Sequence, residues 1–189
     1  NDQCRTIYGA LEIVRNELVW KIKPNIIWET SNGLPLLSAE TMVNMKFGAC
    51  SDYVTLATAV YRSLGMPAFL DEVPFWGRGN QGHVWYNFIS DNGVLTPIQE
   101  DVTTPAGWGF FPYELFPKIY RTSYSIDKDI LKYRKTAKYV YPFDLYKQEV
   151  TDLYFRTQDV QIELKNGLKL KDKYVYIASF NNNNGPKMN

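Results

Sequence analysis

The sequence of 189 residues predicts an α+β fold, because two different hydrophobic patterns follow one another along the chain. The first third carries apolar residues at spacings of three and four, which is typical of amphipathic helices. From residue 83 to 98, apolar and polar residues alternate on both sides of an Asp91-Asn92-Gly93 turn, which is typical of an antiparallel hairpin. Helical segments followed by hairpin strands indicate an α+β domain.

Two helices and a loop are predicted before residue 46. Apolar residues recur at helical spacing from Thr6 to Lys23, and Pro24 ends this helix. The stretch 25–37 contains an Asn-Gly pair and a proline, so we expect a loop there. Ser38 is a good N-cap for a short helix that includes Thr41 to Met45.

The next helix begins near Cys50, and Gly65 ends it. Its predicted buried stripe consists of Tyr53, Leu56, Ala57, Val60 and Leu64. A strand starts at Ala68, and the strand His83–Ile89 is expected to pair with Val94–Ile98 as an antiparallel hairpin.

The rest of the first domain, which we place at residues 1–145, is less regular. Residues 101–117 are rich in Pro, Gly and aromatic residues and predict an irregular segment. We expect a strand at Ile119–Tyr124 and a short helix at Ile126–Tyr133.

Residues 146–189 are predicted to form a β-rich C-terminal extension. The runs Val150–Leu164 and Leu168–Phe180 are joined by Lys165-Asn166-Gly167, a strong hairpin signal, and the tail from Asn181 is expected to be disordered. Because an isolated hairpin is marginally stable, it either packs on the first domain or begins a truncated second domain. Because the sequence starts at Asn1, without methionine, we expect a mature or excised fragment.

Composition and net charge limit the classes of protein to which this chain can belong. Hydrophobic residues make up 45% of the chain and charged residues 22%, as in ordinary globular proteins. The net charge of +1 argues against a nucleic-acid partner, and no apolar run approaches the roughly 20 residues that span a bilayer. The 14 Tyr and 5 Trp suit a surface that touches sugars or peptides, but tyrosine-rich strands explain them as well.

The chain has a single histidine, His83, and it places Cys50 at the predicted N-terminus of a helix. The positive end of the helix dipole and a nearby imidazolium both favour the thiolate, so we expect the pKa of Cys50 to fall below about 8.5. The helix N–H groups can also donate to an oxyanion. We therefore expect Cys50 as nucleophile and His83 as base, although a lone cysteine on an apolar helix is otherwise a small core residue.

No metal or cofactor is expected. One histidine and two distant cysteines do not give the ligand spacing of a zinc site, and no phosphate-binding glycine loop is followed by lysine. Cys4 is expected to be a bystander, because a disulfide with Cys50 would block the nucleophile. Asp52 is expected to be a first-turn helix charge.

The segments around Cys50 and His83 resemble the transglutaminase-like superfamily. The matching strings, in the family's order, are Gly48-Ala49-Cys50-Ser51-Asp52, Arg62-Ser63-Leu64-Gly65-Met66-Pro67-Ala68 and Gly82-His83-Val84-Trp85. Pro74-Phe75-Trp76-Gly77 further resembles a loop in transglutaminase-like surface proteins of gut Bacteroidetes. The resemblance covers about Lys46 to Pro97.

This resemblance implies a papain-like core, with the nucleophile on a helix packed against an antiparallel sheet that carries the histidine. It implies acyl transfer or hydrolysis on a peptide or carboxamide, by a transglutaminase-like cysteine peptidase or amidase without a cofactor. It also implies an extracytoplasmic location, in the periplasm or at the cell surface. The competing interpretation is a weak or inactive module of this fold that binds a glycan or peptide at the cell surface.

The third member of the catalytic triad is where the sequence departs from the family. Aligning Val94–Ile98 with the family's strand puts Gln99 where an Asp is expected, so Gln99 is the predicted orienting residue. Glu100 and Asp101 remain alternatives. Trp76 and Trp85 are predicted either to wall the substrate cleft or to belong to the core.

Overall fold

A computed structural model describes residues 6–22, 25–26, 35–74, 82–90, 92–98, 118–136, 145–163, 178–181 and 185–188. The chain divides into two compact units. The first contains Asn1–Glu72 and Gly82–Glu114, and the second contains Val73–Gln81 and Leu115–Asn189. Cys50 and His83 both belong to the first unit. The domain boundary expected at residue 145 stays a prediction.

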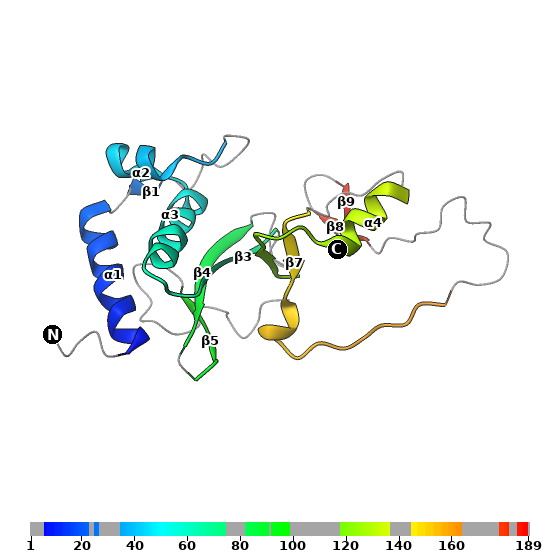
Figure 1. Ribbon diagram of the computed structural model, residues 1–189. Helices are drawn as coiled ribbons and strands as arrows, with labels where there is room; N and C mark the ends of the chain where they lie inside the picture. Colours follow the sequence, from blue (N-terminus) through cyan, green and yellow to red (C-terminus); the bar gives the residue numbers. More distant parts are fainter. Residues whose placement is uncertain are drawn as a thin grey trace. The chain divides into compact units, whose positions relative to one another are not determined.

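The first unit begins with helix α1 (Ile7–Ile22), as the apolar spacing predicted (Figure 1). The prediction of a loop over residues 25–37 is wrong at residues 25 and 26, which form a strand. Strand β1 (Asn25–Ile26) pairs in parallel with β2 (Phe47–Gly48). A strand of two residues has too few positions to show a side-chain period in the sequence.

Helix α2 (Ala39–Met45) begins where the sequence predicted. The Ser38 hydroxyl accepts a hydrogen bond from the Thr41 N–H at 3.1 Å, which satisfies one of the free donors at the helix start. Lys46 ends the helix in the left-handed region, at φ 55°. The one fully buried side chain of α2 is Met42.

Helix α3 (Cys50–Ser63) is the central helix of the unit and contacts α1, α2 and strand β4. Tyr53, Leu56 and Ala57 are buried as predicted, and Gly65 ends the turn at φ 81°. The prediction for Leu64 is wrong, because this residue is 59% exposed. It is the C-cap residue, where the backbone leaves the helix and the apolar stripe no longer continues.

The sheet of the first unit has the strand order β5-β4-β3, with β3 at Ala68–Val73, β4 at His83–Ile89 and β5 at Leu95–Ile98. The predicted hairpin is confirmed, because β4 and β5 pair antiparallel and Tyr86 lies opposite Ile98. Gly93, at φ 77°, and the hydrogen bond from Ser90 N–H to the Val94 carbonyl close its turn.

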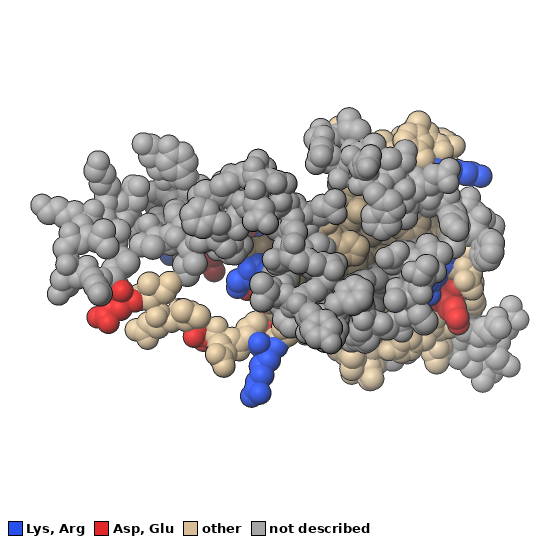
Figure 2. All heavy atoms as spheres, turned by 180° about the vertical axis from the view of Figure 1, so that it is seen from behind, with Lys and Arg blue, Asp and Glu red and all other residues tan. Residues whose placement is uncertain are grey.

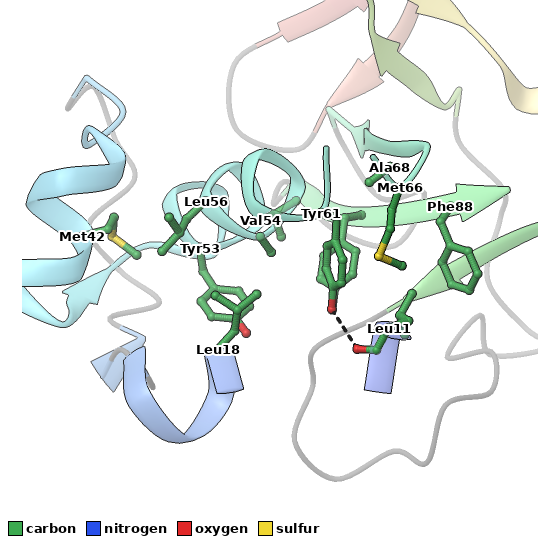
Figure 3. Packing of buried hydrophobic residues seen from close by; sticks show 12 residues of the cluster. Leu11, Leu18, Met42, Tyr53, Val54, Leu56, Tyr61, Met66, Ala68 and Phe88 are labelled. Carbon is green, nitrogen blue, oxygen red and sulfur yellow. Dashed lines mark hydrogen bonds between the residues drawn. The ribbon is translucent and has the colours of Figure 1, made fainter. Parts of the chain in front are cut away.

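The core lies between the helices and this sheet (Figure 3). Tyr61 on α3 and Tyr86 on β4 stack at a ring distance of 5.2 Å, with their hydroxyl oxygens 3.4 Å apart. The Tyr61 hydroxyl also donates to the Leu11 carbonyl of α1 at 3.4 Å, the dashed line in Figure 3. These contacts join α1, α3 and β4 in one core.

The second unit contains the antiparallel pair β6 (Tyr120–Thr122) and β7 (Lys147–Glu149), and helix α4 (Lys128–Thr136). The predicted strand and short helix are thus confirmed with shifted ends. The Thr151 hydroxyl accepts from the Ile119 N–H at 3.0 Å, which fastens the turn after β7 to the residue before β6.

The strand expected at Val150–Leu164 is wrong over its described part. Thr151–Leu153 form a short 3₁₀ helix (η2), and residues 154–163 form no strand. Val160 is 77% exposed, so the alternating pattern there has no face to bury.

The C-terminal tail also differs from the prediction of disorder. β8 (Ala178–Asn181) and β9 (Gly185–Met188) form an antiparallel pair. Main-chain hydrogen bonds between strands do not require apolar side chains, so the polar tail had no hydrophobic pattern that could predict this pair. The predicted turn at Lys165-Asn166-Gly167 and the irregular segment 101–117 lie outside the described residues.

Candidate active site

Cys50 is the first residue of α3 and is a free, half-buried thiol. Burial raises its pKa above the ordinary value, and the nearby Asp52 carboxylate raises it further. The backbone N–H groups of Ser51 and Cys50 lower the pKa, but by less than burial raises it. The expected fall in the thiol pKa is therefore wrong, because loss of solvent outweighs the helix N-terminus. At neutral pH, Cys50 rests as a thiol and needs a base to become a nucleophile.

Asp52 fixes the start of α3. Its carboxylate is buried and accepts two backbone hydrogen bonds, both at 2.8 Å, from the N–H groups of Ala49 and Leu37. The bond from Ala49 satisfies a donor at the helix N-terminus, as expected for a first-turn acid. The bond from Leu37 ties the segment before α2 to the residues beside Cys50. The sequence did not reveal this second bond, since it joins positions 15 residues apart.

Gly48, in β2, leaves the space that this arrangement needs. A Cβ atom at residue 48 would lie 2.7 Å from the Met42 sulfur and 3.1 Å from the Asp52 carboxylate oxygen Oδ2. Both neighbours are buried, so neither has room to move freely. A glycine two residues before Cys50 thus lets α2 and Asp52 pack closely against the segment that leads into Cys50.

His83 is the first residue of β4 and is partly exposed. Its imidazole stacks on the indole of Trp85, with ring centres 5.9 Å apart and planes at 26°. Trp85 itself is only 1% exposed. The indole therefore forms a rigid support for the histidine ring, and its predicted contact with substrate stays a prediction.

Side chains along β4 alternate between the two faces of the sheet. The face toward α3 belongs to the apolar core and carries Val84, Tyr86 and Phe88; we call it the core face. The opposite face carries His83, Trp85 and Asn87; we call it the histidine face.

Cys50 and His83 are the first residues of two elements that contact one another, α3 and β4. The N–H of Ile89, at the end of β4, donates to the carbonyl of Pro67, just after α3, at 3.3 Å. The His83 side chain lies on the histidine face, opposite the face that packs on α3, so the predicted contact between the Cys50 sulfur and the His83 ring stays a prediction.

Several predicted residues lie outside the described part of the chain, namely Trp76, Gln99, Glu100, Asp101 and Cys4. Among the residues that the structure does describe, no three His, Cys, Asp or Glu side chains gather in a way that could hold a metal ion. None of the described helices is long and apolar enough to cross a membrane. On the described surface in Figure 2, basic and acidic side chains are interspersed.

Sequence reasoning missed two buried polar residues of the sheet, Asp71 on β3 and Asn87 on β4, both fully buried. The available signal was a charged residue inside the otherwise apolar first half of a strand, since Asp71 follows Ala-Phe-Leu. Buried carboxylates are rare unless they meet donors or cations.

Residues 6–99 match the transglutaminase-like superfamily. This segment, built from helices and sheet, is therefore similar to a transglutaminase-like domain, and it contains Cys50 and His83. Members of this superfamily generally include cysteine-dependent acyltransferases and peptidases. Comparison with curated proteins found no match, and neither did comparison with solved structures.

Proposed function

We propose that this protein carries out cysteine-dependent acyl transfer or hydrolysis on a peptide or carboxamide, with Cys50 as nucleophile and His83 as general base. The observation that carries the proposal is positional. Within the segment that matches the transglutaminase-like superfamily, a free thiol begins α3 and the only histidine of the chain begins β4, and these two elements contact one another.

The reaction follows from these two groups. As the Cys50 sulfur attacks the carbonyl carbon, its proton passes to His83, and a sulfur–carbon bond forms. The imidazolium then protonates the leaving nitrogen, the carbon–nitrogen bond breaks, and an amine or ammonia departs from the acyl-enzyme. Water or a second amine attacks the thioester and gives its proton to His83, which returns it to the thiolate. The products are an acid or a new amide.

The raised pKa of Cys50 decides how the nucleophile is activated. Because burial keeps the thiol protonated, the site does not begin as a thiolate–imidazolium pair. His83 must instead remove the proton during attack, as a general base does for serine. In this proposal the backbone N–H groups of Cys50 and Ser51, at the start of α3, donate to the oxyanion that develops in the same step.

Gln99 is proposed as the residue that orients His83, with Glu100 and Asp101 as alternatives. The support comes from the register of the described strands, in which Tyr86 lies opposite Ile98. One further residue in that register would set Gln99 opposite Trp85, beside His83 on the same face. Its amide oxygen could accept from the ring, although it would stabilise an imidazolium less than a carboxylate does.

The finer assignment is a transglutaminase-like cysteine peptidase or amidase, extracytoplasmic, related to the surface proteins of gut Bacteroidetes. The support is the resemblance of the Pro74–Gly77 loop and of the segment around His83. In this proposal Trp76 and Trp85 wall the substrate site, with Trp85 behind the histidine ring. The substrate is a peptide or protein.

The decisive experiment labels the intact chain with a thiol-directed reagent at several pH values and measures each cysteine separately by mass spectrometry. Cys4 is the internal control. We expect labelling of Cys50 to fall in His83→Ala, and ammonia release from a glutamine-containing peptide to require both Cys50 and His83. Adding a primary amine to the assay separates transamidation from hydrolysis. If Cys50→Ala releases ammonia at the wild-type rate, the proposal is wrong.

The burial that raises the pKa of Cys50 favours one second candidate, a catalytically weak or inactive module that binds a peptide or glycan at the cell surface. In that case the labelling of Cys50 is unaffected by His83→Ala. Binding of peptide or glycan then persists in Cys50→Ala, as measured by calorimetry.

A further inference from the structure

Asp71 is a buried carboxylate that the proposed reaction does not yet use. It lies on β3, where Ala68 and Leu70 face the apolar core, so the alternation of the strand turns Asp71 to the other side. That side is the histidine face of the neighbouring strand β4. Asp71 is fully buried, and so is Trp85.

The register between β3 and β4 fixes which residues are neighbours. The hydrogen bond from Ile89 to Pro67 joins the end of β4 to the residue before β3, so the two strands run antiparallel. Residues joined by such a bond lie directly opposite one another. Counting inward from this pair places Asp71 opposite Trp85 and one diagonal step from His83. Diagonal neighbours on one face are separated by about 7–8 Å, within reach of a ring and a carboxylate.

We propose that the Asp71 carboxylate positions the His83 imidazole by accepting a hydrogen bond from one of its ring N–H groups. Asp71 is then a positioning residue, because it touches neither the substrate nor Cys50. This inference rests on the proposed function. Because one ring nitrogen must take the proton of Cys50, only the other can donate, so Asp71 is the alternative to Gln99 as its acceptor. Asp71 supplies a negative charge that the neutral Gln99 does not have, and that charge stabilises the imidazolium formed when Cys50 loses its proton.

Two other acidic residues, Asp52 and Glu72, lie close in sequence to Cys50 and Asp71, but neither is a candidate partner for the His83 ring. The Asp52 carboxylate already accepts two backbone hydrogen bonds at the start of α3. Glu72 follows Asp71 on β3, but strand alternation turns it to the opposite face. The competing partner of Asp71 is the indole N–H of Trp85, which also needs an acceptor when buried.

The test uses the fact that the chain has one histidine, so a single imidazole appears in a proton–nitrogen NMR titration. We expect Asp71→Asn to lower the pKa of His83 by about one unit or more, since a carboxylate beside an imidazole favours its charged form. Glu72→Gln is the matched control: it removes the same charge one residue away, on the other face, and should shift the pKa of His83 much less.

Two results would overturn the proposal. Equal shifts of the His83 pKa in Asp71→Asn and Glu72→Gln would show only a long-range charge effect. No shift of the His83 pKa in Asp71→Asn would mean that the carboxylate accepts from the Trp85 indole and not from His83. Should Asp71→Asn not fold, the wild-type titration decides: a His83 pKa above about 6.5 supports the contact, and a value at or below it contradicts it. Cys50→Ser in the same titration tests the catalytic pair separately.

Discussion

The two faces of strand β4 carry different kinds of side chain, although their residues alternate along one strand. The core face carries Val84, Tyr86 and Phe88, which pack on α3 and α1 in an apolar cluster. The histidine face carries His83, Trp85 and Asn87, and the inferred register places Asp71 of β3 on the same side. Both faces are largely buried, but a buried carboxylate and a buried amide, those of Asp71 and Asn87, are assigned only to the second.

This difference indicates where stability and function reside. Burying a side chain such as Phe88 stabilises the fold through the apolar area removed from water. Burying Asp71 and Asn87 costs free energy unless each polar atom is hydrogen-bonded. A face that keeps buried polar groups around a single histidine is the part of the sheet suited to position a reactive ring. Substitutions on the two faces should therefore separate activity from stability.

The largest expected effect is on activity, at the histidine face. His83→Ala should lower the rate of amide cleavage by about a thousandfold, or about 4 kcal/mol in transition-state stabilisation, because the chain offers no other imidazole. The side chain is partly exposed, so the free energy of unfolding should change by less than about 1 kcal/mol. Ammonia release and urea unfolding measure the two quantities. If His83→Ala had normal activity, the histidine face could not be the face on which activity depends.

The next effect is on stability, at the core face. Phe88 is 1% exposed, and the ring of Tyr8 packs on its edge at 5.5 Å between centres. Phe88→Ala should lower the free energy of unfolding by about 3–5 kcal/mol, because it leaves a cavity between α1 and β4. Urea denaturation at neutral pH measures this. Val94→Ala, at an exposed position, is the control and should change little. A loss below about 1 kcal/mol would show that the core face is not the stabilising one.

The sequence predicted the elements whose signals are local. The apolar period of α1 and α3, the Ser38 cap and the turn between β4 and β5 all lie within a few residues, and all were confirmed. The errors arose where a strand carries no local hydrophobic pattern. β1 and β2 have two residues each and pair across 22 positions, and β9, the partner of β8, lies in the tail that was expected to be disordered.

The site was predictable to a similar degree. The helix-start position of Cys50 and the strand-start position of His83 follow from local pattern. The pKa of Cys50 does not, because it depends on burial by parts of the chain that are distant in sequence. For the same reason the position of Asp71 beside Trp85 emerged only from the strand register.

A smaller effect is expected at Gly48, where α2 packs against the start of α3. Gly48→Ala places a methyl group 2.7 Å from the Met42 sulfur and 3.1 Å from the Asp52 carboxylate. We expect a loss of about 1–3 kcal/mol in unfolding free energy, together with slower labelling of Cys50 as Asp52 shifts. Met42→Ala in the same chain should restore part of the loss by removing the closest clash. If Met42→Ala restores none of the lost unfolding free energy, the clash with the Met42 sulfur is not the cause of the loss.

The smallest effect concerns pH and the thiol itself. The folded chain raises the pKa of Cys50 above its ordinary value of 9.0, so the folded state holds the thiol proton more tightly than the unfolded state. Its stabilising contribution is therefore fully present below about pH 9 and is lost as the pH rises through the higher folded value. Cys50→Ser removes the titrating group, so its unfolding free energy should fall less between pH 8 and about pH 10 than that of the wild type. Urea titrations of both proteins across this range measure the difference. A steeper fall for Cys50→Ser would mean that the thiol is not held protonated by burial, and the general-base role of His83 would give way to a preformed thiolate.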